Sequence, residues 1–314
     1  DRAYMALSLR RRPNDQLRLF ELSNLATAMR VPTVVTNDVL FHEPGRRILQ
    51  DVVTCIRHNV TIDALGHSGD GVAETATGRA FIPYTLPGET VEIERDGERA
   101  RVTRIVTPSA DRVAPLCRHF GVCGNCALEH MAPRAYRDWK SEQVRAAFAQ
   151  RGIVADVEPI VAIAPGTRRR AIFSAIRTPH GTVFGFHERH SDQIVQIEEC
   201  ATLVPAIVGK LAMLRAIASI VLSRWKPARI TVLACDNGLD IAIAGAGKPD
   251  RTMLEKLGAY GTDPAIARLV VDGVEVLRNR IPEILAGPPQ RQPTPGGFVQ
   301  AAPTAEEALA AAFI

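Results

Sequence analysis

The sequence predicts a protein of mixed α/β class with several domains, and three observations lead to that prediction. A chain of 314 residues exceeds the roughly 100–200 residues of one typical domain. Short apolar runs separated by Pro-Gly and Asp-Gly turns predict strands over residues 64–113. Apolar residues at helical spacing predict helices over residues 133–152 and 203–222.

Composition places the chain among ordinary globular proteins, with 46% hydrophobic and 23% charged residues. The net charge of +4 permits a nucleic-acid partner without demanding one. The longest apolar stretch, residues 203–222, contains Pro205, Lys210 and Arg215, so it predicts a buried amphipathic helix rather than a membrane span. No secretory leader pattern opens the sequence, and we therefore expect a cytoplasmic protein.

Residues 1–62 are expected to form an α/β segment. A helix is predicted from Asp15 to about Arg30, and its buried side should carry Leu19, Leu22, Leu25 and Met29. The stretch PTVVTND predicts a short buried strand, and RRILQDVVTCIRHN predicts a second helix. The character of the sequence changes at the Gly-rich stretch that follows, and the first domain boundary is placed near residue 63.

Residues 63–114 predict a small OB-like β-barrel. The runs RAFIPY, ETVEIER and ERARVTRIV alternate apolar and charged residues, with Val91, Ile93 and Val102 on the apolar side. About five short strands in some 50 residues suit such a barrel.

Residues 115–290 predict an α+β domain. A helix should begin at Pro133 and end at Gly152, and hairpins should turn at TPHG (178–181) and DNG (236–238). Residues 287–297 have the composition of a linker. Residues 291–314 should open a further unit, in which Thr304 and Glu307 form a capping box at the start of an Ala-rich helix. Because the chain starts at Asp1 and stops inside this helix, we expect a fragment at both ends.

The stretch CRHFGVCGNCALEH holds three of the six cysteines, Cys117, Cys123 and Cys126, and Cys200 follows downstream. In a reducing compartment clustered cysteines bind metals more often than they form disulfides. Four thiolates can hold zinc or a 4Fe–4S cluster. Structural zinc sites usually contain two C-x2-C pairs, and this spacing lacks the second pair. The spacing favours the iron–sulfur cluster, with zinc and three unligated thiols as the alternatives.

The segment RRRAIFSAIRTPHGTVFGFHERH (168–190) combines basic and aromatic residues. Arginines neutralise phosphates and aromatic rings stack on unpaired bases, so RNA contacts are predicted. The predicted contact residues are Arg168, Arg169, Arg170, Phe184 and Phe186. A solvated hairpin with its Phe residues in the core explains the same segment equally well.

Other motifs predict less chemistry. Cys55 and Cys235 lie among apolar residues and are expected to be core residues rather than nucleophiles. GHSGDG (66–71) is followed by strands rather than by a helix, so it is not a dinucleotide fingerprint. Asp38 and His42 are two potential ligands, which do not make a metal site by themselves.

From about Ala64 to its end, the chain resembles the bacterial uracil-5 RNA methyltransferases of the iron–sulfur type. LGHSGDGVA and FIPYTLPGETV resemble their TRAM domain, and C-x5-C-x2-C, RRRA, GLDI and GGFVQAAPTAEEAL follow in the family's order. The resemblance implies a 4Fe–4S cluster on Cys117, Cys123, Cys126 and Cys200. It also implies that Gln300 helps to bind S-adenosylmethionine, and that residues 291–314 are the truncated start of a Rossmann-like methyltransferase domain.

In that family a cysteine attacks C6 of a flipped-out uracil, C5 takes the methyl group, and a base then removes the C5 proton. The nucleophile and base lie beyond the FVQ segment, so the resemblance implies a chain that does not methylate by itself. It implies a monomer that binds RNA, either rRNA or tRNA.

Residues 1–62 resemble the end of the PHP domain of error-prone, bacterial-type DNA polymerase alpha subunits. The stretch VPTVVTNDVLFHEPGRRILQDVVTCIRHNVTID carries this likeness. Such domains commonly keep Asp-x-His, whereas this chain has Asp38-Val39-Leu40, so metal chemistry is not expected. Two incomplete units that meet near residue 63 suggest a hybrid reading frame.

The leading hypothesis is therefore the RNA-binding and cluster-bearing part of an S-adenosylmethionine-dependent RNA (uracil-5-)-methyltransferase. A second hypothesis is an RNA-binding module that acts with a separate partner enzyme. A third is a fragment of an error-prone DNA polymerase alpha subunit.

Overall fold

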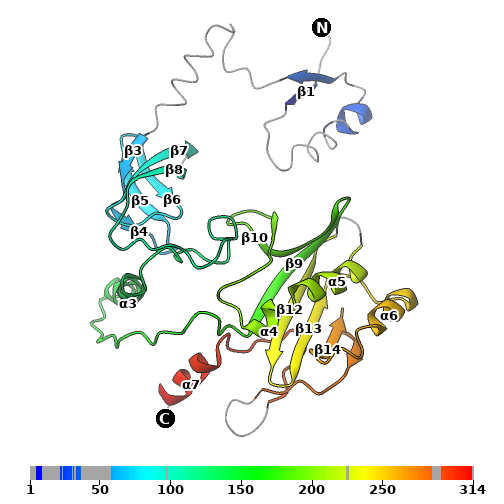
Figure 1. Ribbon diagram of the computed structural model, residues 1–314. Helices are drawn as coiled ribbons and strands as arrows, with labels where there is room; N and C mark the ends of the chain where they lie inside the picture. The colour runs from blue at the N-terminus through cyan, green and yellow to red at the C-terminus, as the bar shows by residue number, and fades with distance from the viewer. Residues whose placement is uncertain are drawn as a thin grey trace.

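A computed structural model describes residues 5–8, 22, 24–29, 31, 33–36, 58–96, 98–223, 226–284 and 291–312. These residues form a small parallel pair of strands, a six-stranded sheet and a seven-stranded sheet, joined by helices and loops (Figure 1). The mixed α/β class is confirmed. None of the helices in these ranges is long and apolar enough to cross a membrane.

The N-terminal part pairs β1 (Met5–Ser8) with β2 (Thr33–Thr36) in parallel. The strand predicted from PTVVTND is thus confirmed, and residues 24–28 are helical as predicted. The predicted buried side of that helix is wrong in part, because Leu25 is 48% exposed and Met29 is 62% exposed, whereas Ala26 is buried. Leu19, Asp38, His42 and Cys55 lie outside the described residues.

The six-stranded sheet has the order β3-β7-β8-β6-β5-β4. Its strands are β3 (His58–Thr61), β4 (Ala64–Leu65), β5 (Gly71–Thr75), β6 (Gly78–Ile82), β7 (Thr90–Asp96) and β8 (Arg99–Thr107). The predicted alternation is confirmed, since Val91 and Ile93 are buried in the core that the curled sheet encloses. The sheet is curled, and its six strands have the short lengths that the turn signals predicted.

This sheet begins before the boundary expected at residue 63. Strand β3 pairs antiparallel with β7, with Val60 opposite Val91, and the side chains of Val60 and Ile62 are in the core. The end of the helix predicted from RRILQDVVTCIRHN is therefore wrong, because His58 and Asn59 belong to a strand. The alternating apolar residues Val60 and Ile62 favour that strand over a continued helix.

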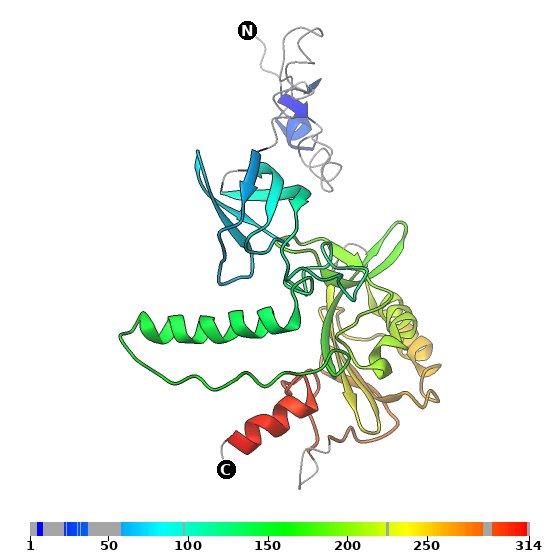
Figure 2. The same ribbon diagram turned by 60° about the vertical axis from the view of Figure 1, so that its left-hand side comes forward.

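Helix α3 (Pro133–Ala149) follows a loop that holds three of the cysteines. Pro133 opens it, and Gly152 has a left-handed φ of 70° just beyond its end, as the sequence predicted. None of its residues is buried, although Ala135 and Trp139 contact a small cluster of Leu86, Leu128 and Met131. Figure 2 shows α3 and the segment after it standing apart from the seven-stranded sheet.

The seven-stranded sheet has the order β11-β10-β9-β12-β13-β14-β15. Its strands are β9 (Arg170–Thr178), β10 (Gly181–His187), β11 (Ile194–Gln196), β12 (Ala228–Cys235), β13 (Gly238–Ala244), β14 (Ile266–Val271) and β15 (Val274–Arg278). The hairpin turns predicted at residues 178–181 and 236–238 are both confirmed.

Helices cover one face of this sheet. The helix predicted over residues 203–222 is divided into α4 (Pro205–Val208) and α5 (Leu211–Val221), because the chain leaves α4 at Gly209. Helix α5 and α6 (Arg251–Gly258) contribute Leu214, Ile217 and Leu257 to the core against the sheet. The opposite face of β9 and β10 is free to carry polar residues.

The C-terminal segment, residues 291–302, returns to that opposite face before α7 (Pro303–Ala312). A Cβ on Gly296 would lie 3.4 Å from the Cβ of Ala242 on β13, so the segment lies against the sheet. Helix α7 begins at Pro303, one residue before the capping box predicted at Thr304, and Ala302 precedes it. None of the residues of α7 is buried.

Candidate metal centre

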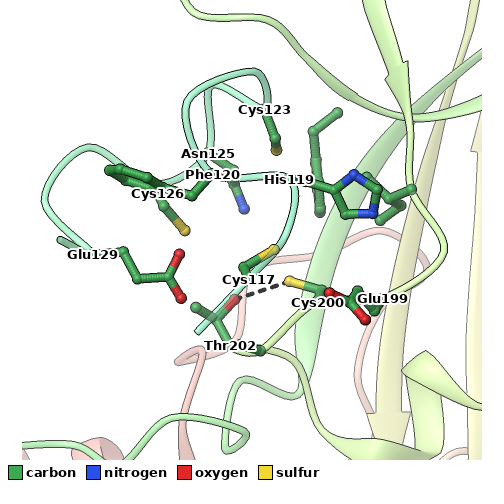
Figure 3. A pocket seen from close by; sticks show the side chains of 13 residues that line it. Cys117, His119, Phe120, Cys123, Asn125, Cys126, Glu129, Glu199, Cys200 and Thr202 are labelled. Carbon is green, nitrogen blue, oxygen red and sulfur yellow. Dashed lines mark hydrogen bonds between the residues drawn. The ribbon is translucent and has the colours of Figure 1, made fainter. Parts of the chain in front are cut away.

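Four cysteines line one cavity. Cys117, Cys123 and Cys126 come from the loop between β8 and α3, and Cys200 comes from the segment after β11 (Figure 3). His119 and Glu129 also line the cavity, whose volume is about 20 Å³. The structure thus brings together all of the ligands that the sequence predicted.

The cysteine loop is folded by tight local hydrogen bonds and docks on the end of β10. The Cys123 N–H donates to the His119 carbonyl at 2.8 Å, and the Gly124 N–H donates to the His187 carbonyl at 2.9 Å. A Cβ on Gly124 would lie 2.6 Å from the Arg189 nitrogen, closer than any real Cβ contact. Glycine is therefore required where the loop crosses the chain after β10.

Cys200 reaches the cavity through pairing with the start of β9. The Arg168 N–H donates to the Thr202 carbonyl and the Val204 N–H donates to the Arg168 carbonyl, each at 3.0 Å. The sulfur of Cys200 lies 3.2 Å from the Thr202 hydroxyl oxygen. The two segments are also linked directly, because the Glu198 N–H donates to Nε2 of His119 at 3.3 Å.

The cavity disfavours ionised thiols while no cation is present. Burial, together with the nearby Glu129 carboxylate, raises the pKa of Cys126 to about 12. Burial also raises the pKa values of Cys123 and Glu129. A thiolate-binding cation would reverse this preference, because metal binding releases thiol protons.

A single metal ion in a protein needs several donor side chains close together. Within the ranges that the structure describes, no three His, Cys, Asp or Glu side chains are grouped closely enough to hold one ion. The four thiols nevertheless face a common space (Figure 3). Four thiol donors facing one cavity are the donor set of a zinc site and also of a 4Fe–4S cluster, so the donor set by itself does not choose between the two.

The predicted base-stacking roles of Phe184 and Phe186 are wrong for this fold. Phe184 is 1% exposed and Phe186 is 8% exposed. Both rings pack on the fully buried Phe173, with centroids 4.7 and 4.9 Å apart. They are core residues, as the alternative explanation of the segment held, and cannot stack on a base without opening the sheet.

Arg169 and Arg170 hold the C-terminal segment instead of facing solvent. The buried Arg169 donates through Nε to the Gln300 carbonyl at 3.2 Å, and its guanidinium pairs with Glu306. Arg170 donates to the Gly297 carbonyl at 3.0 Å. The prediction that Arg169 contacts phosphate is therefore wrong, whereas Arg168 is exposed and stays a predicted contact.

The alternation of side chains along β9 is the sequence signal that could have predicted the burial of Arg169. Ala171, Phe173 and Ala175 point to the core side of β9, so Arg169 two residues earlier lies on the same side. Gln300 is partly buried and its backbone is held by Arg169, while its role toward S-adenosylmethionine stays a prediction.

Cys235 lies apart from the candidate metal centre, at the end of β12. Burial, with the nearby Asp240 and Asp236 carboxylates, raises the pKa of its thiol to about 12. Because the thiolate is the nucleophilic form, this cysteine is poorly suited to covalent catalysis. Cys235 is half-buried and is not one of the residues of the hydrophobic cores in the described ranges, so its predicted role as a core residue stays a prediction.

His130 is a site-adjacent residue that the sequence reasoning missed. It is fully buried, and its ring lies 5.1 Å from that of Phe120, a residue of the cysteine loop that lines the cavity. Phe120 in turn meets Tyr84 of the six-stranded sheet region edge-on at 5.1 Å. The aromatic contacts therefore join the cysteine loop to the first sheet.

Comparison with known proteins gives two kinds of relatives. An uncharacterized RNA methyltransferase of Mesorhizobium japonicum is 38% identical over 250 residues, which is 80% of this chain and 60% of that protein. One from Caulobacter vibrioides is 40% identical over 261 residues, which is 80% of this chain and 62% of that protein. The chain thus spans about 60% of the length of these relatives. No protein-family model matches the chain.

The second kind of relative matches a shorter stretch. Error-prone DNA polymerase 1 of Agrobacterium fabrum is 82% identical over 66 residues, which is 21% of this chain and 6% of that protein. The larger part of the chain is therefore homologous to proteins named RNA methyltransferases, and an N-terminal part is similar to error-prone DNA polymerases.

Proposed function

We propose that residues 58–312 are the RNA-binding and 4Fe–4S-bearing part of an S-adenosylmethionine-dependent RNA (uracil-5-)-methyltransferase. The observation that carries this proposal is the convergence of Cys117, Cys123, Cys126 and Cys200 on one cavity from two distant stretches of chain. The names of the relatives support methyl transfer to RNA, and S-adenosylmethionine is proposed as the methyl donor.

The four cysteines would hold the cluster as thiolates, and the cluster would supply a cross-link between the loop before α3 and the segment after β11. The chain's own residues prepare this site. His119 receives the Glu198 N–H, and Arg118 pairs with Glu198 at 2.7 Å, so the two ligand-bearing segments are already aligned. The first sheet is proposed to be the TRAM domain.

Methyl transfer is proposed to need residues other than the cysteines described here. The four cavity cysteines are assigned to the cluster, and Cys235 has a raised pKa. Gln300 is proposed as one contact to S-adenosylmethionine. The polymerase-like stretch covers 6% of its relative, so we propose no polymerase activity.

The test is the metal content of the protein purified without oxygen. The expected result is about four iron and four sulfide per chain, as a 4Fe–4S cluster requires. Cys200→Ser should lower the iron content, because it removes a ligand from the segment after β11. The matched control, Cys235→Ser, removes a cysteine outside the cavity and should leave the iron content unchanged.

Two results would contradict the proposal. One is a protein that contains no iron or that contains zinc in its place. The other is a Cys200→Ser variant whose iron content equals that of the unaltered chain.

A further inference from the structure

A second and larger cavity lies beside the candidate metal centre. Its volume is about 500 Å³, and its lining comes from three separate parts of the chain. Ser68 belongs to the turn before β5, Asn125 to the cysteine loop, and Ile172 and His187 to strands β9 and β10. The GHSGDG turn, which matched no cofactor motif, therefore has a place in the wall of a cavity.

The wall of this cavity is held by Arg189. Its guanidinium pairs with Asp70 at 2.8 Å and donates to the Ser68 carbonyl at 3.0 Å. It also lies over the ring of Tyr84, 5.6 Å from the centroid. Arg189 and Asp70 are each 13% exposed, so this ion pair fixes the turn before β5 against the chain after β10. The cavity is thus present before any ligand binds.

Two residues close to this cavity have a strained backbone conformation. Tyr84 and His190 have left-handed φ values of 64° and 57°, and they are two of the three non-glycine residues in the described ranges with positive φ. Both line a neighbouring cavity that shares Arg189 and His190 with the larger one. Such strain costs on the order of 1–3 kcal/mol per residue and clusters at binding sites.

The chemistry of the cavity suits a flat, neutral heterocycle. Ile172, which is 40% exposed, is its main apolar lining residue, and Phe186, which is 8% exposed, also lines it. Ser68, Asn125, the imidazoles of His187 and His190 and the Glu188 carboxylate give it a polar rim that can accept and donate hydrogen bonds. One nitrogen of the Arg189 guanidinium pairs with Asp70, and its Nη1 is buried without a hydrogen-bond partner in the described residues, so this arginine is not exposed to a phosphate. Unpaired bases are recognised by this combination of apolar faces and polar edges.

We propose that this cavity binds an unpaired base of RNA. This inference rests on the proposed function, which supplies RNA as the partner, and it identifies where the strand is bound. It also revises the RNA-contacting residues of β9 and β10, because Ile172 and His187 lie on the side of these strands opposite the buried Phe184. His187 is oriented by a 2.8 Å contact between its Nε2 and the Ser174 hydroxyl.

The same side of the sheet offers a path for the adjoining phosphates. Ser174 pairs with Arg229 on β12, so the exposed Arg229 side chain lies on the face that carries Ile172. The exposed Arg168 precedes β9. A strand whose base enters the cavity can therefore run across this face toward exposed arginines, which contact phosphates without reading sequence.

The test measures the Kd of a short fluorescein-labelled single-stranded RNA by fluorescence anisotropy, with the duplex of the same sequence as a comparison. Ile172→Ala removes the main apolar lining side chain, and His187→Ala removes a rim imidazole. Each should raise the Kd for the single strand at least about fivefold, as expected for loss of one base contact. The duplex should bind more weakly than the single strand.

Two control variants separate contact from structure. His180→Ala removes an exposed imidazole at the turn between β9 and β10, outside the cavity, and Ile281→Ala removes an exposed isoleucine outside the cavity. Both should change the Kd less than about twofold. RNA carrying 4-thiouridine should also cross-link, on irradiation, to the peptide that contains His187 and His190.

The outcomes separate this inference from the proposed function. If the unaltered chain binds RNA but Ile172→Ala and His187→Ala bind as tightly, or if cross-links map only to other peptides, the cavity assignment is wrong and the proposed function stands. If His180→Ala weakens binding as much as His187→Ala, the effect does not come from the cavity and the assignment fails. If the unaltered chain binds no RNA, both are overturned.

Discussion

His130 shows how one buried side chain can make stability depend on pH. It is fully buried, and neither ring nitrogen has a hydrogen bond of normal geometry. Burial, assisted by the charge of Arg112, lowers its pKa to about 4, while the charge of Glu89 and the Thr85 backbone act in the opposite direction. The folded protein therefore holds His130 neutral at a pH where the unfolded chain would protonate it.

The sign of the effect follows from this difference. Below a pH of about 6.5 the unfolded chain gains a proton that the folded chain does not bind until about pH 4, so stability falls as the pH falls through this window. The cost at pH 5.5 is about 1 kcal/mol. We expect the Tm of His130→Leu to decrease less between pH 7.5 and pH 5.5 than the Tm of the unaltered chain.

The control for this measurement is His180→Leu, which replaces an exposed histidine at the turn between β9 and β10. It should keep the full pH dependence of the unaltered chain. Equal pH dependence in the unaltered chain and His130→Leu would show that His130 does not contribute.

At the scale of elements, three arginines attach the C-terminal segment to the seven-stranded sheet. Arg268 on β14 forms a buried, two-bonded ion pair with Asp240 at 2.8 and 2.9 Å and donates to the Pro293 carbonyl at 2.7 Å. Arg170 and Arg169 bind the carbonyls of Gly297 and Gln300. Backbone carbonyls along the segment are thus satisfied by charged donors, which form stronger hydrogen bonds than neutral ones.

Arg169→Ala is expected to loosen this segment and α7. It leaves Glu306 with only the Arg291 pair at 2.9 Å in the described residues and removes the donor to Gln300. A local loss of about 1–3 kcal/mol should speed amide hydrogen exchange over residues 297–312 by about tenfold or more. Exchange should be measured by mass spectrometry.

The neighbouring exposed arginine supplies the control. Arg168→Ala should leave hydrogen exchange over residues 297–312 unchanged, because the Arg168 side chain donates to the Arg170 carbonyl and not to this segment. If residues 297–312 exchange their amide hydrogens at the same rate in Arg169→Ala and Arg168→Ala, Arg169 does not hold the segment.

At the scale of the whole molecule, the two large sheets have separate cores that meet at the cysteine loop. One core lies inside the curled six-stranded sheet and the other between the seven-stranded sheet and its helices. Leu128 and Met131 after the loop pack against Leu86 of the first sheet, and Arg189 pairs with Asp70 across the same junction. The loop between β8 and α3 therefore contacts both sides, the core of the seven-stranded sheet through Cys123 and the first sheet through Leu128 and Met131.

The position of β3 predicts where a stable version of the first sheet must begin. A chain that starts at residue 57 keeps β3, whereas one that starts at residue 63 loses the buried Val60 and Ile62. Burial of two such side chains contributes about 3–6 kcal/mol. We expect the free energy of unfolding of the shorter chain to be lower by that amount. Its midpoint in urea denaturation should be lower accordingly.

The chain that starts at residue 57 is the control, because it keeps β3. The free energy of unfolding of its six-stranded sheet should be close to that in the full chain. Equal urea midpoints for the chains starting at residues 57 and 63 would show that β3 is dispensable.

The sequence alone determined the local features: the hairpin turns at 178–181 and 236–238, the start of α3 at Pro133, and the set of four cysteines. These follow from the conformations that Pro and Gly allow and from side-chain periodicity, which act over a few residues. The mixed α/β class follows from the same local signals.

Only the tertiary structure decided which of these residues meet. Strand register turned Arg169 and Phe184 inward, although the basic and aromatic composition of their segment suggested a surface. Pairing of Arg168 with Thr202 brought Cys200 to the cysteine loop, and the Arg189–Asp70 pair closed a cavity from three distant stretches. Such contacts depend on the packing of both sheets at once, and short-range propensities carry no information about partners so far apart in the chain.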